Sequence, residues 1–71
     1  MNGREFLKRV ERWAALRGLT VVFDRSHGKG SHGRLFVGAR FTTVKDLKRE
    51  IGKGLLRSMA KDLGIDPKDL R

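Results

Sequence analysis

The segment RLFVGARFTTV, residues 34–44, decides the fold because it holds two strand-like runs joined by a turn signal. Both runs are rich in β-branched and aromatic residues, which favour strands. Gly38 and Ala39 between them suit a tight two-residue hairpin with glycine at the first turn position. We therefore expect two strands, Arg34–Gly38 and Ala39–Val44, that pair antiparallel.

Side chains alternate between the two faces of a strand, so this hairpin also predicts a buried and an open surface. Arg34 and Phe36 should share one face, opposite Leu35 and Val37. We favour Leu35 and Val37 for the core. Phe36 is either a core residue or part of a stacking surface, depending on which face the helices cover.

Upstream of the hairpin, the sequence predicts a helix and another strand. LTVVFD, Leu19–Asp24, has the composition of a strand. Before it, Asn2 can cap a helix, with Glu5 at the spacing of a capping box, and Gly18 stands where a C-terminal glycine cap is expected. The apolar residues of this helix fall on one stripe at helical spacing: Phe6, Leu7, Val10, Trp13 and Ala14. Trp13 is therefore favoured as a core anchor over a base-stacking platform.

Downstream, a basic connector, Lys45–Gly54, leads into the amphipathic segment LLRSMAKDLG, residues 55–64. Gly64 is the expected C-terminal cap of this helix, with Ile65 packing back. A last short turn is expected where Asp66 precedes Pro67. The apolar residues of the helix follow an i, i+3, i+4, i+7 spacing: Leu56, Met59, Ala60 and Leu63.

The order helix, three strands, helix predicts an α+β fold in one small domain, residues 1–71. The simplest packing lays both helices on one face of a three-stranded antiparallel sheet and leaves the other face open. This is the architecture of the double-stranded-RNA-binding domain, which recognises RNA largely by its shape and backbone.

The charge of the chain points to a polyanionic partner. Seventeen Lys and Arg residues against eight acidic residues give a net charge of +9, which favours nucleic acid first and an anionic membrane second. Cysteine is absent, so nothing indicates an oxidising compartment, and we expect a cytoplasmic location. No apolar run approaches the roughly 20 residues that span a bilayer, and the N-terminus lacks the core of a signal peptide.

The glycine-rich segment DRSHGKGSHGRLFVG, residues 24–38, contains both histidines of the chain, each within a Ser-His-Gly tripeptide. Two histidines without cysteine do not complete a structural zinc site, so no metal is expected. The glycines lead into a strand, whereas a phosphate-binding P-loop leads into a helix. General acid–base catalysis on RNA remains, because imidazole exchanges protons near neutrality and the ribose 2′-hydroxyl is a built-in nucleophile.

Three features together resemble the HicA family of bacterial toxins. These are Gly-Ser-His entering a strand at residues 30–32, the connector TTVKDLKREIGKGLL at 42–56, and the final helix LLRSMAKDLGI at 55–65. The resemblance covers about the last two thirds of the chain. It implies a double-stranded-RNA-binding-like fold and a small mRNA interferase that uses no cofactor. It also implies that a HicB-like antitoxin neutralises a monomeric toxin.

The resemblance assigns the catalytic role to the histidine that closes the Gly-Ser-His motif, which is His32. His27 has no counterpart in the family and is interpreted as an echo of the motif. Many members follow the histidine with a second histidine or a bulky residue, whereas this chain has Gly33. This difference leaves the acid–base partner of His32 unassigned.

The residues around His32 receive supporting roles in binding RNA. Gly30 and Gly33 are expected to give the phosphodiester room, and Ser31 either contacts the imidazole or phosphate or caps a turn. The candidates for contact with phosphate lie beside the motif and in the connector: Lys29, Arg34, Lys45, Lys48, Arg49 and Lys53. The alternative for the connector is a solvated charged loop.

Two other functions fit the same features. One is an RNA-binding module of the same fold without catalytic activity, which would tolerate the loss of His32. The other is a DNA-associated architectural protein, which competition between RNA and DNA of the same sequence would reveal.

Overall fold

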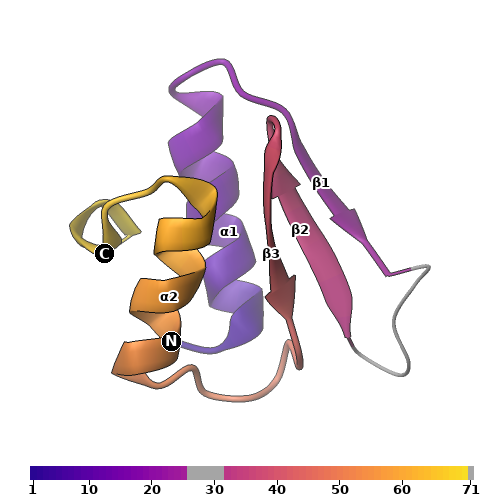
Figure 1. The fold of residues 1–71 in the computed structure, drawn as a ribbon, viewed down its shortest axis with the longest axis vertical. Helices are drawn as coiled ribbons and strands as arrows, with labels where there is room; N and C mark the ends of the chain where they lie inside the picture. The colour runs from indigo at the N-terminus through magenta and orange to yellow at the C-terminus, as the bar shows by residue number, and fades with distance from the viewer. Residues whose placement is uncertain (26–31, 71) are drawn as a thin grey trace.

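The computed structural model describes residues 1–25 and 32–70, and it confirms the predicted α+β order of helix, three antiparallel strands and helix. Figure 1 shows both helices on the same side of the sheet, which forms a layer of its own. The elements are α1 (Gly3–Ala15), β1 (Val21–Asp24), β2 (Gly33–Val37), β3 (Arg40–Val44), α2 (Lys53–Leu63) and the short 3₁₀ helix η1 (Pro67–Leu70).

The hairpin between β2 and β3 forms as the sequence predicts. Val37 pairs with Arg40 across Gly38 and Ala39, and the strands follow in the order β1-β2-β3. Gly38 has a φ of 59°, whereas Ala39 has a negative φ. A positive φ at the first turn position alone is the type II′ geometry, which matches the right-handed twist of paired strands.

The helices cover one face of the sheet and leave the other open. Leu35, Val37 and Val44 are buried beneath the helical layer, as expected for Leu35 and Val37. On the opposite face, Val22 is 51% exposed and Phe41 is 49% exposed. We call this second surface the open face of the sheet.

Helix α1 begins at its predicted cap and packs through its predicted stripe. The Asn2 side chain accepts a hydrogen bond from the Glu5 backbone N–H at 2.9 Å. The Glu5 carboxylate lies 3.5 Å from Arg9 one turn along the helix. The most buried residues of the stripe are Phe6, Val10 and Ala14, with Leu7 and Trp13 packed at its edges.

The connector between β3 and α2 is fixed at its backbone by the start of α1. Gly3 N–H donates to Arg49 C=O at 3.3 Å, and Arg4 N–H donates to Leu47 C=O at 3.0 Å. A Cβ atom at Gly3 would lie 2.8 Å from the carbonyl oxygen of Asp46, so glycine allows the two segments to approach. The backbone of the connector is therefore held by hydrogen bonds along its length, while its basic side chains are exposed.

Helix α2 begins at Lys53, so Lys53 and Gly54 belong to its first turn and not to the connector as predicted. Gly64 ends the helix in the left-handed conformation, with φ at 71°, and Ile65 N–H donates to Ala60 C=O at 2.9 Å, as the glycine cap predicts. Thr42 on β3 is buried, and its hydroxyl donates to Asp62 at 2.9 Å. This bond joins α2 to the sheet.

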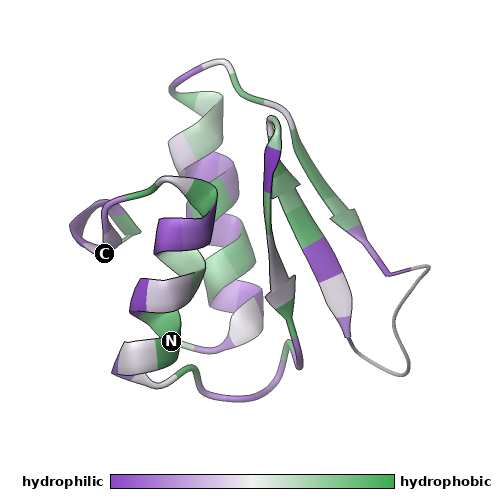
Figure 2. Ribbon diagram, viewed as in Figure 1, coloured by the Kyte–Doolittle hydropathy of each residue, from purple (hydrophilic) through white to green (hydrophobic). Residues whose placement is uncertain are grey.

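The core lies between the sheet and the helical layer, and Leu70 of η1 closes it from the C-terminal side. Figure 2 shows a mostly hydrophilic connector below the sheet and hydrophobic residues along β1. Within residues 1–25 and 32–70, no helix has the length and apolar character needed to cross a bilayer. The buried hydrophobic residues are Phe6, Val10, Ala14, Leu35, Val37, Val44, Ile51, Met59, Ala60, Leu63, Ile65 and Leu70.

Candidate nucleic-acid interface and catalytic histidine

His32 lies directly before β2 and its side chain is exposed. It stands two residues before Arg34, which begins the open-face positions of the strand. Among the described residues, no hydrogen bond or ion pair engages the imidazole. The exposed ring lies at the end of the sheet where the central strand begins.

The sheet register brings cationic residues from separate segments beside His32. Gly33 pairs with Val44, so His32 and Lys45, the next residue outward on each segment, leave the sheet at neighbouring positions. Arg34 pairs with Thr43 on one side and with Asp24 on the other. Arg34 and Lys45, two of the predicted phosphate-binding residues, thus lie near the predicted catalytic histidine. In the sequence, Arg34 and Lys45 are 11 positions apart.

An aromatic surface adjoins this end of the sheet. The rings of Phe36 and Phe41 lie 5.6 Å apart between centroids, with an angle of 34° between their planes. The guanidinium of Arg34 stands over the Phe41 ring, 5.8 Å from its centroid. Because the helices cover Leu35 and Val37, Phe36 lies on the open face, which decides between its two predicted roles in favour of a surface position.

The expectation that Gly33 gives a phosphodiester room is wrong. The residue is buried, and a Cβ atom there would lie 2.6 Å from Cζ of Phe23 on β1. Alternation directs position 33 toward the helical side of the sheet, where the Phe23 ring fills the space. Glycine at this position allows β1 to pack closely against the start of β2.

The other basic candidates lie at the same end of the molecule as the start of β2. Lys48 and Arg49 are exposed on the connector, and Lys53 is exposed in the first turn of α2. In Figure 1, β2 and both helices begin at this end, and β3 finishes there. Helix α2 has no acidic residue in its first turn and no side-chain cap at Gly52, so its positive dipole end adds to the basic side chains.

Several predicted site residues lie outside the described residues. These are Lys29, Gly30 and Ser31, and His27, which received no role, also lies outside the described residues. Their predicted roles remain expectations from the sequence.

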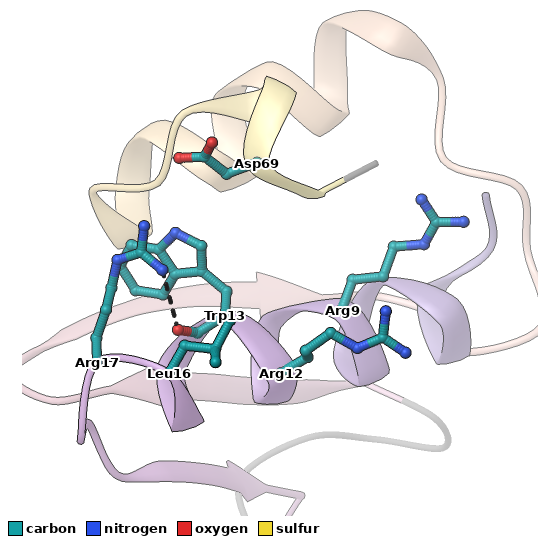
Figure 3. Close-up of a pocket in the computed structure, with 6 residues that line it drawn as sticks. All are labelled: Arg9, Arg12, Trp13, Leu16, Arg17 and Asp69. Carbon is teal, nitrogen blue, oxygen red and sulfur yellow. Dashed lines mark hydrogen bonds between the residues drawn. The ribbon is translucent and has the colours of Figure 1, made fainter.

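A hollow of about 230 Å³ lies in the helical layer and not on the open face. Figure 3 shows its six lining residues, Arg9, Arg12, Trp13, Leu16, Arg17 and Asp69. Arg9 donates to Leu70 C=O at 2.8 Å, and Arg17 stacks 4.1 Å from the centre of the Trp13 ring. The Arg9 hydrogen bond joins α1 to η1, and the Arg17 contact is local to the end of α1, so both serve the packing of the protein itself.

Trp13 is half-buried and packs against the core, in agreement with its predicted role as an anchor. The Arg17 guanidinium covers its ring, so this face of the indole is occupied by the protein itself. Stacking of a base on Trp13 would require Arg17 to move away. On the open face, Arg34 lies farther from the ring that it covers, at 5.8 Å from the Phe41 centroid against 4.1 Å for Arg17 over Trp13.

In the described part of the chain, no group of three or more His, Cys, Asp and Glu residues is arranged to hold a metal ion. Known family models, curated proteins and solved structures give no match to this chain.

Sequence reasoning missed Phe41 as a site residue, although the signal was present. A two-residue turn at Gly38 and Ala39 fixes the pairing of the strands, and counting outward from it matches Phe36 with Phe41. The same count places Lys45 level with His32. The predicted hairpin thus contained the arrangement of the site.

Proposed function

We propose that the protein is a metal-independent endoribonuclease that cleaves mRNA, acting as the toxin of a toxin–antitoxin pair in the cytoplasm. The observation that carries the proposal is the exposed imidazole of His32 at the start of β2, the central strand, with Arg34 and Lys45 on neighbouring positions. The resemblance to HicA toxins, which assigns catalysis to the same histidine, supports it. The net charge of +9 supports an RNA substrate.

The chemistry requires two proton transfers and stabilisation of one phosphate. The 2′-oxygen attacks the adjacent phosphorus while a base removes its proton. The bond from phosphorus to the 5′-oxygen breaks, and an acid protonates that oxygen. The products are a 2′,3′-cyclic phosphate and a free 5′-hydroxyl. His32 performs one of these transfers, and Arg34 and Lys45 stabilise the additional negative charge that develops on the phosphate.

A HicB-like antitoxin would neutralise this activity most directly by covering His32 and the basic edge around it. Acidic groups on the antitoxin would be attracted to Arg34, Lys45 and Lys48, which are exposed. Such charge complementarity accelerates association and excludes the RNA phosphates from the same surface.

The function is tested by cleavage in the presence of EDTA. The purified protein should cleave single-stranded RNA and leave DNA of the same sequence intact, because DNA lacks the 2′-hydroxyl. Products should carry cyclic phosphate and 5′-hydroxyl ends, which end-labelling with polynucleotide kinase detects. Cleavage of the DNA, or loss of RNA cleavage on adding EDTA, would contradict the proposed chemistry.

Binding of RNA should weaken with salt in proportion to the number of cations that contact phosphate. For single strands, log K falls against log[salt] with a slope of about −0.7 for each contact. If Arg34, Lys45, Lys48 and Lys53 all participate, the slope should be about −3, and Arg34→Ala or Lys45→Ala should each make it shallower by about 0.7. Fluorescence anisotropy with the inactive His32→Ala protein provides the measurement.

Lys68→Ala is the matched control, because Lys68 is exposed on η1 in the helical layer. Its slope should equal that of the parent. A slope near zero in the parent would contradict binding through phosphates, and equal changes in all three variants would contradict a localised basic edge.

A further inference from the structure

The open face of the sheet carries apolar side chains that no part of the described chain covers. Val22 is 51% exposed and Phe41 is 49% exposed, and Phe36 lies between them in the sheet. Val22 pairs with Phe36, and Phe36 pairs with Phe41, so the three residues form one row across β1, β2 and β3. We call this row the aromatic face.

The aromatic face lies next to the end of the sheet that carries His32. Arg34 occupies the next open-face position on β2, and its guanidinium already contacts the Phe41 ring at 5.8 Å from the centroid. A strand rises about 3.4 Å per residue, so positions 34 and 36 lie about 7 Å apart. A ligand on the aromatic face therefore passes Arg34 before it reaches the imidazole.

We propose that the aromatic face binds unpaired bases of a single-stranded RNA, and so holds the strand beside His32. This inference deepens the proposed function and rests on it for the identity of the nucleic acid. Every base has a π-face that stacks on aromatic side chains, and stacking on protein rings combined with basic residues along the backbone is how single strands are bound without sequence readout.

The charge of the surface selects this occupant over a second copy of the chain. Another copy would bring a net charge of +9 against the Arg34 edge, and the like charges would repel. A double-stranded RNA keeps the faces of its bases stacked inside the helix, so it presents phosphates but no rings to Phe36 and Phe41. A single strand supplies both the negative backbone and the flat apolar groups.

The test compares three ligands of equal length in the His32→Ala protein, which leaves RNA intact. These are a single-stranded RNA, the same RNA in a duplex, and an abasic ribose-phosphate oligomer. The single strand should bind tightest. Phe41→Ala should weaken its binding by about 5- to 150-fold, the factor for losing one stacked base, and should leave binding of the abasic oligomer unchanged.

Two further substitutions separate stacking from general hydrophobic contact. Phe41→Trp keeps an aromatic ring and should retain binding, whereas Phe41→Leu keeps apolar bulk and should lose it. Leu16→Ala is the control, because Leu16 is 80% exposed at the end of α1 in the helical layer, and its loss should leave the affinity unchanged. Circular dichroism checks each variant for folding, and Phe41→Leu preserves the test if Phe41→Ala does not fold.

The proposal would be overturned if Phe41→Ala lowered the affinity for the single strand and for the abasic oligomer equally. Tighter binding of the duplex than of the single strand would overturn it too. Sedimentation that showed a dimer dispersed by Phe41→Ala would overturn it as well, because the face would then be a self-interface. Failure of the proposed function is distinguishable: a parent protein that cleaves no RNA refutes the nuclease assignment, while the binding comparison among the three ligands remains valid.

Discussion

Phe6→Ala should strongly destabilise the folded state, whereas Phe41→Ala should change its stability little. Phe6 on α1 is fully buried in the core. Truncation of a buried Phe to Ala costs about 3–5 kcal/mol, from lost burial and from the cavity that remains. A domain of this length has a total stability of about 4–11 kcal/mol, so the loss amounts to about a quarter of it or more. The thermal midpoint should fall by tens of degrees.

Phe41 supplies the matched control because the chemical change is identical. Its ring is 49% exposed, and its main contact is the cross-strand pair with Phe36. Such pairs contribute about 0.2–1 kcal/mol, so the midpoint should shift by a few degrees. Thermal melts followed by circular dichroism measure both variants. Equal shifts would contradict the assignment of Phe6 to the core and Phe41 to the open face.

The hairpin was predictable from the sequence because its determinants are local. Gly38 permits the positive φ that a type II′ turn requires, and the flanking runs are rich in β-branched and aromatic residues. Turn length then fixes the register, and the register fixes which side chains share a face. Arg34 and Phe36 therefore lie on the open face as the alternation predicted.

The remaining features depend on contacts between distant segments, which periodicity does not show. Gly33 faces the Phe23 ring, and Gly3 faces the backbone of the connector, so both glycines are needed for close packing. Leu70 is buried although only a short turn was expected near it. Helix α2 starts at Lys53 because two glycines beside a lysine do not prevent a helix whose later turns are held by core contacts.

His32→Ala should reduce RNA cleavage by about 10²–10⁴-fold, the usual contribution of a positioned acid or base. The residue precedes β2, and its neighbour Gly33 is paired with Val44, so the backbone that carries the imidazole is anchored to the sheet. The side chain itself is exposed and supports no packing, so the substitution should leave the thermal midpoint within about 2 °C of the parent. RNA binding should remain, because the cations and the aromatic face are unchanged.

His27→Ala should retain most of the RNA cleavage activity, which makes it the control for His32→Ala within the same segment. Both histidines occupy a Ser-His-Gly tripeptide, but the HicA resemblance assigns a role only to the one that enters the strand. Catalysis by proton transfer requires a fixed distance between the imidazole and the reacting oxygen, and anchoring to a sheet supplies that constraint. Both variants are assayed on one RNA in EDTA, with folding checked in parallel. Full activity in His32→Ala would leave an RNA-binding module as the better description, and loss in His27→Ala alone would transfer the catalytic role to the first copy of the motif.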